Sequence, residues 1–114
     1  MRTLVVSGLL AVLTLVLATS ATATEVACRT KDLTQGTTQL VLEWQGGSAK
    51  GTLQRTAPSG NVTTLTVRAE RHDGTIIADD IYEKDLVSHA AVVRVVDGKR
   101  YMRTDASAPW LACE

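Results

Sequence analysis

The two cysteines are the residues whose type and position most directly predict a chemical event. Cys28 lies shortly after the apolar start of the chain, and Cys113 is the next-to-last residue. Two cysteines allow a single intramolecular disulfide, which persists in oxidising compartments outside the cytoplasm. A redox-active pair is the alternative, but the Cys-x-x-Cys spacing of thiol oxidoreductases is missing. We therefore predict a structural Cys28–Cys113 disulfide, which stabilises the fold by roughly 4 to 5 kcal/mol because it closes a long loop.

The other chemically active side chains do not match a catalytic or metal-binding motif. His72 and His89 lie far apart in the sequence with no third histidine, so a zinc site would need carboxylates as well. Four carboxylates occur between Asp79 and Asp85, but they lack the ligand spacing and central glycine of an EF-hand loop. The Gly-x-Ser-x-Gly motif of serine hydrolases is also missing from the sequence. We therefore expect no enzymatic activity, no metal and no cofactor.

A group of three cations and one aromatic ring is the strongest candidate for a binding site. Residues 92–96 and 99–104 flank Asp97-Gly98, a dipeptide that favours the type I′ turn of a β-hairpin. The register set by this turn places four side chains on one hairpin face: Arg94, Lys99, Tyr101 and Arg103. Arginine binds carboxylates through two hydrogen bonds and tyrosine offers rigid contact area, so this face suits an acidic protein partner. The alternative is an ordinary solvated sheet face on which long side chains cover the neighbouring valines.

Two hairpins are expected to supply most of the core. The dipeptide Gly46-Gly47 suits a tight turn between two alternating runs within residues 37–56. Pairing about this turn sets Glu43 opposite Lys50 on the polar face. The other face then buries Leu40, Leu42, Trp44 and Leu53. In the Asp97-Gly98 hairpin the inner face carries Ala91, Val93, Val95 and Met102, with Arg100 near the turn.

Further strands are predicted where apolar and polar residues alternate between turn signals. They cover residues 26–33, 62–70, 75–78 and 110–113. The segment Asp80 to Val87 is predicted to form a helical turn, because Asp80 followed by an acidic residue three positions later resembles a capping box. The fold class is therefore mainly all-β: a small antiparallel β-barrel or sandwich of six to eight short strands, with one short helical turn and a single terminal disulfide.

Residues 1–23 are predicted to be a cleavable secretory signal peptide. Arg2 precedes an uncharged apolar run from Leu4 to Ala18, and Ala21-x-Ala23 fits the small-residue rule of signal peptidase. An uncleaved membrane anchor is the alternative, but this run is shorter than the ~20 apolar residues that span a bilayer. Lipid attachment at the first cysteine is opposed by Glu25, which stands where a lipidation site has an aliphatic residue.

Removal of this segment leaves residues 24–114 as one small β domain, secreted or periplasmic, with no membrane span. Its charge is nearly balanced, because eleven Lys and Arg then stand against twelve Asp and Glu. Nucleic acids and anionic membranes attract proteins with a clustered positive excess, so neither is expected as a partner. An extracellular or periplasmic protein is the expected partner.

The cysteine positions and the expected architecture resemble the periplasmic inhibitors of c-type lysozyme. The resemblance covers a terminal disulfide that closes a small exported β domain, with Trp110 shortly before the last cysteine. The Ser-Gly-x-Arg-Tyr stretch expected in the middle of that family's chain is missing, and the stretch Gly98-Lys99-Arg100-Tyr101 lies elsewhere, so no inhibitory residues are transferred. We expect a non-enzymatic binding module or protein-type inhibitor that acts outside the cytoplasm. A structural or accessory cell-envelope protein is the alternative.

Overall fold

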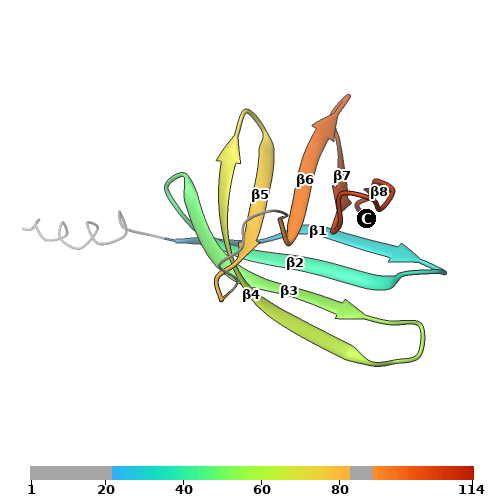
Figure 1. Ribbon diagram of the computed structural model, residues 1–114. Helices are drawn as coiled ribbons and strands as arrows, with labels where there is room; N and C mark the ends of the chain where they lie inside the picture. Colours follow the sequence, from blue (N-terminus) through green and yellow to red (C-terminus); the bar gives the residue numbers. More distant parts are fainter. Residues whose placement is uncertain (1–21, 83–88) are drawn as a thin grey trace, which may run out of the picture.

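The computed structural model describes residues 22–82 and 89–114, and the regular structure in these ranges is entirely β (Figure 1). Its eight strands follow one another in a single sheet, and each is antiparallel to the next. They are β1 (Ala23–Asp32), β2 (Gly36–Gln45), β3 (Ser48–Thr56), β4 (Val62–His72), β5 (Thr75–Asp80), β6 (Ala91–Val96), β7 (Lys99–Arg103) and β8 (Leu111–Ala112). The predicted all-β class is confirmed. The single sheet curls into a nearly closed barrel, which decides between the two predicted architectures.

The hairpin of β2 and β3 has the predicted register. Glu43 lies opposite Lys50 across the two strands. The apolar side chains assigned to the inner face are all buried: Leu40, Leu42, Trp44 and Leu53. In the turn, Gly46 adopts a φ of 69°, a left-handed conformation that glycine reaches without the steric cost of a Cβ. The turn chemistry therefore sets which residues of this hairpin face the core.

A close approach of β2 and β3 at Gly51 lets this hairpin bend around the core. A Cβ placed on Gly51 would fall on the carbonyl oxygen of Val41 in β2. Gly51 also lies opposite Leu42, whose side chain is fully buried. Glycine is common in strands where two backbones come this close. The missing side chain at position 51 therefore permits the tight coiling of the two strands.

The hairpin of β6 and β7 also has the predicted register, with Arg94 opposite Tyr101. Both residues of the Asp97-Gly98 turn have positive φ, 53° and 78°, as a type I′ turn requires. Val95 shares this inner face as predicted but is not buried there, since Val95 is 46% exposed. The pairing of β5 with β6 stops at Val93, so the hairpin tip extends past the strand that would have covered Val95.

The predicted helical turn is not found at the residue where it was expected to begin. Asp80 is the last residue of β5, and its carboxylate accepts a hydrogen bond from the N–H of Tyr82 at 2.9 Å. This contact spans two residues and forms an Asx turn, whereas a capping box spans three. Residues 83–87 of the predicted segment lie outside the described residues, and the described residues contain no helix.

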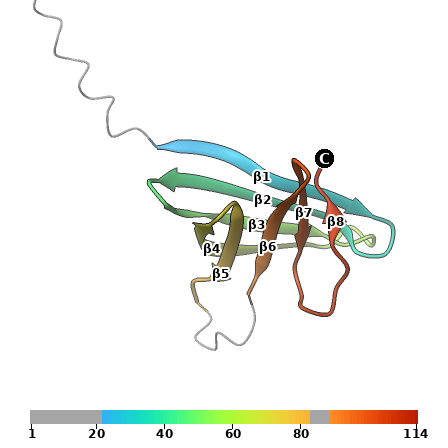
Figure 2. The same cartoon turned by 90° about the horizontal axis from the view of Figure 1, so that it is seen from above.

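Contacts between β1 and the C-terminal strands close the barrel (Figure 2). The N–H of Glu114 donates a hydrogen bond to the carbonyl of Arg29 at 2.7 Å. Cys28 and Cys113 form the predicted disulfide, with Cα atoms 5.1 Å apart. A bulge interrupts the pairing of β1 at Ala27, so that this residue and the next are both buried. The first and last strands are thereby joined, although they are the two ends of the strand order.

The core fills the barrel with aliphatic side chains and one large aromatic ring. Its buried residues are Ala27, Cys28, Leu40, Leu42, Trp44, Ala49, Leu53, Val67, Ala69, Ile76, Ala78, Ala91, Val93 and Met102. Strands β1 to β7 all contribute to this set, so the core depends on residues from distant parts of the chain. The described ranges contain no helix long and apolar enough to cross a membrane.

Candidate partner-binding face

The four residues of the predicted binding site lie together on the outer face of the β6–β7 hairpin. Arg94 stands opposite Tyr101 across the hairpin. Lys99 and Arg103 lie two residues to either side of Tyr101 along β7, and alternate residues of a strand share a face. Arg94 and Lys99 are exposed, while the other two side chains are half-buried. The structure therefore brings together all four residues that the sequence pattern selected.

Trp110 joins this face although it lies outside the hairpin. The guanidinium carbons of Arg94 and Arg103 lie 4.1 Å and 4.5 Å from the centroid of its ring. Contacts of a cation with an aromatic ring stabilise by about 0.5 to 1 kcal/mol at exposed sites, and here they orient both guanidinium groups. The five residues Arg94, Lys99, Tyr101, Arg103 and Trp110 are called the basic face below.

The pairing of β7 with β8 brings Trp110 to the basic face. Met102 of β7 lies opposite Leu111 of β8. Because the strands are antiparallel, Arg103, the residue after Met102, lies beside Trp110, the residue before Leu111. Residues 104–109 form an irregular loop between these strands, without a hairpin dipeptide that would fix a register. The sequence reasoning therefore missed this aromatic ring. The predicted disulfide, which fixes the end of β8, was the one available signal.

The cations of the basic face remain available to an external acid. In the described part of the chain, Arg94, Lys99 and Arg103 form no ion pair.

Asp105 is an acidic group near Arg103. Its pKa is lowered mainly because the backbone N–H and then the hydroxyl of Ser107 donate hydrogen bonds to it at 3.0 and 3.1 Å, and nearby arginines, Arg103 among them, lower the pKa further.

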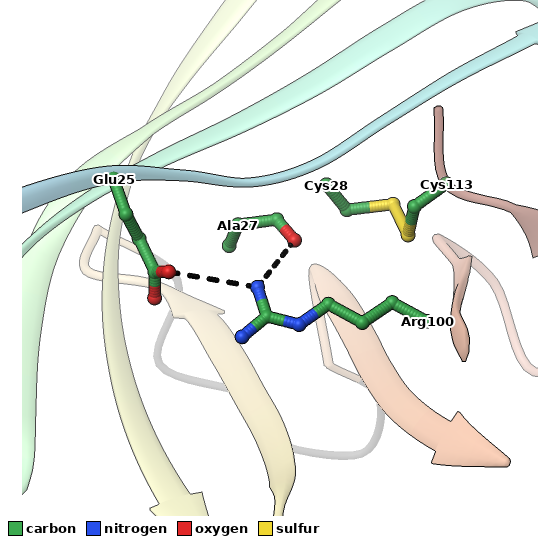
Figure 3. The surroundings of a disulfide bond; sticks show 5 residues. All are labelled: Glu25, Ala27, Cys28, Arg100 and Cys113. Atoms are coloured by element: carbon green, nitrogen blue, oxygen red, sulfur yellow. Dashed lines mark hydrogen bonds and ion pairs between the residues drawn. A yellow bond between two sulfur atoms is a disulfide. The ribbon is translucent and has the colours of Figure 1, made fainter. Parts of the chain in front are cut away.

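Glu25 connects β1 to the inner side of the same hairpin (Figure 3). Its carboxylate accepts a hydrogen bond from Nε1 of Trp44 at 2.7 Å and lies 3.4 Å from Nη2 of Arg71. Nη1 of Arg100 lies 3.6 Å from the second carboxylate oxygen and donates to the carbonyl of Ala27 at 2.9 Å. The charged side chains are 32 to 47% exposed, so each ion pair contributes at most about 1 kcal/mol. Together with the disulfide they brace the hairpin against β1.

The two histidines contact separate carboxylates. Nδ1 of His89 lies 2.6 Å from Oδ1 of Asp79, and Nε2 of His72 lies 3.3 Å from Oε1 of Glu70. Among the described residues, no three histidine, cysteine or acidic side chains gather in a way that could hold a metal ion. The acidic positions 83 and 85 lie outside the described residues.

Comparison of the chain with protein-family models, with curated proteins and with solved structures found no match. A functional proposal must therefore depend on the fold and on the basic face.

Proposed function

We propose that this protein is a non-enzymatic binding module of the protein-inhibitor type, which acts outside the cytoplasm and binds an acidic surface of another protein. The basic face supports the proposal, because it gathers three cations and two aromatic rings on one hairpin surface. Arginine, tyrosine and tryptophan are the residue types that contribute most to protein–protein binding. Charge-assisted hydrogen bonds from arginine to a carboxylate add both affinity and orientation.

The fixed geometry of the face also favours binding. Arg94 and Arg103 are held over the ring of Trp110 before a partner arrives. A guanidinium stacked on a ring still directs its N–H groups outward in its own plane, where a carboxylate can accept them. Side chains that are ordered in the free protein lose less entropy when the complex forms. An exposed pair of unbraced arginines would not have this advantage.

Capture of a partner from the native extracellular or periplasmic fraction tests the proposed function. The wild-type protein should retain one stoichiometric protein. The double variant Arg94→Gln with Arg103→Gln should bind that protein at least roughly tenfold more weakly, because two charge-assisted contacts are lost. A matched control removes two exposed cations from β3 and β4, as Lys50→Gln with Arg68→Gln, and should bind like the parent.

Three outcomes would contradict this assignment. Equal weakening of capture in the two double variants would show that net charge, and not the basic face, attracts the partner, and parental binding by the Arg94/Arg103 variant would show that the face is not used. Recovery of envelope material without a stoichiometric protein would favour a structural or accessory cell-envelope role instead. All four substituted residues lie on strand surfaces, so both double variants should remain folded. Circular dichroism checks this.

Processing of the exported chain provides a separate prediction. We expect the mature protein to begin at Thr24, which leaves all of β1 except its first residue, Ala23. Cys28 is engaged in the disulfide and therefore has no thiol to offer for lipid attachment. Intact mass spectrometry of the exported protein should show the loss of residues 1–23. Retention of these residues, or a lipid adduct on Cys28, would contradict the assignment.

A further inference from the structure

The first half of β4 is an open edge of the sheet. β5 pairs with β4 only from Val67 onward, and the N–H of Ile81 extends this contact by donating to the carbonyl of Thr66 at 3.1 Å. Within the described residues, no strand lies on this side of the segment 62–65. In Figure 1 this half of β4 forms the lower border of the sheet, and the second half turns to run beside β5.

The backbone of Thr64 offers an unused donor and acceptor at this edge. In an antiparallel strand, the N–H and C=O of one residue point to the same side, and the side alternates along the chain. The carbonyl of Thr66 faces β5, because it accepts the bond from Ile81. Thr64 lies two positions earlier and therefore directs both polar groups to the same side, where the described residues provide no strand.

The usual protections of an exposed edge are missing here. Soluble proteins protect edge strands with lysine, proline or a bulge. The segment 62–66 reads Val-Thr-Thr-Leu-Thr, with no charge and no proline, and its pairing with β3 is regular. Three exposed apolar side chains border the edge: Val62 at 57%, Ile81 at 40% and Tyr82 at 78% exposure. An uncharged edge rich in β-branched residues is a template for pairing with another strand.

We propose that this edge pairs with the same edge of a second copy of the chain. The two β4 strands run antiparallel about a two-fold axis at Thr63, so that each Thr64 exchanges both backbone hydrogen bonds with Val62 of the second copy. Asn61 then lies opposite Leu65 of the second copy, and the contact ends before Thr66, whose outer side is occupied by Ile81. Two copies of one uncharged segment match each other by symmetry, and the register brings no like charges together.

Sedimentation velocity of the exported protein over a dilution series tests the proposal. The wild-type protein should pass from monomer to dimer as its concentration rises, because a strand-edge interface of this size is small and weak. Thr64→Lys places two like charges diagonally across the two-fold axis and should raise the dissociation constant of the dimer roughly tenfold or more. Thr64→Pro removes the outward N–H, which the fold itself does not use, and should have a similar effect.

The matched control is Thr52→Lys, which adds the same charge to the same exposed outer face one strand away from the edge. It should change the dissociation constant by no more than roughly twofold. Hydrogen exchange gives a second readout, since the amide of Thr64 should become protected as the dimer forms. A monomer at every concentration, or a dimer that both Thr64 variants leave intact, would overturn the proposal. Equal weakening by Thr52→Lys and Thr64→Lys would overturn it as well.

Discussion

Replacement of Cys28 and Cys113 by serine should lower the free energy of unfolding by roughly 4 to 5 kcal/mol. The two residues are 85 positions apart, so the disulfide restricts nearly the whole domain in its unfolded state. It also joins β1 to the residue that follows β8, beside the hydrogen bond from Glu114 to Arg29 that closes the barrel. For a domain with a total stability of about 5 to 15 kcal/mol, this loss is a large fraction.

Urea denaturation of the parent protein and of the double serine variant measures this effect. The variant should show a much lower midpoint, and the parent should lose the same stability when a reductant is added. Below its melting temperature the variant should still bind a partner, because neither cysteine belongs to the basic face. Coincident unfolding curves would show that the disulfide does not stabilise the fold, and two free thiols in the native protein would show that it has not formed.

The substitution Leu42→Asp should unfold the domain, whereas Glu43→Gln at the next position should be nearly silent. Leu42 is fully buried opposite Gly51, where the close approach of β2 and β3 leaves no room for rearrangement. The change removes roughly 2 to 3 kcal/mol of apolar burial and places a carboxylate among aliphatic side chains. Glu43 is exposed and lies opposite Lys50 without a close ion pair, so its effect should stay within about 0.5 kcal/mol.

Circular dichroism and urea denaturation of these two variants check the alternation of β2. Without urea, Leu42→Asp should give the circular dichroism spectrum of an unfolded chain. At the same temperature, Glu43→Gln should be folded and should unfold at the same urea concentration as the parent. The reverse order, or equal losses in both variants, would mean that the polar and apolar faces of β2 have been exchanged.

Local signals were sufficient to predict the two hairpins. In each, a glycine-containing dipeptide set the turn, Gly46-Gly47 in one and Asp97-Gly98 in the other, and the alternation of residues then fixed the register. Alternation alone did not decide burial, because Val95 lies on the inner face yet extends beyond the neighbouring strand. How far β5 extends beside β6 depends on the arrangement of the whole sheet. The sequence of β6 alone therefore does not predict which of its residues are covered.

Contacts between distant segments could not be predicted in the same way. Arg100 meets Glu25 only because the sheet curls until β7 reaches β1. The arrival of Trp110 at the basic face depends on an irregular loop and a strand of two residues. Asp80 was misassigned for a different reason, since the same carboxylate pattern that caps a helix also closes an Asx turn.

Fluorine NMR of the protein labelled with fluorotryptophan, with and without the captured partner, tests most directly whether the basic face is the binding site. The chain has two tryptophans, and the variant Trp44→Phe assigns their two signals. Trp110 lies between the arginines of the basic face, whereas Trp44 is 8% exposed in the core. The partner should shift or broaden the Trp110 signal and leave the Trp44 signal in place. Saturated binding with an unchanged Trp110 signal would contradict the proposal that this face holds the partner.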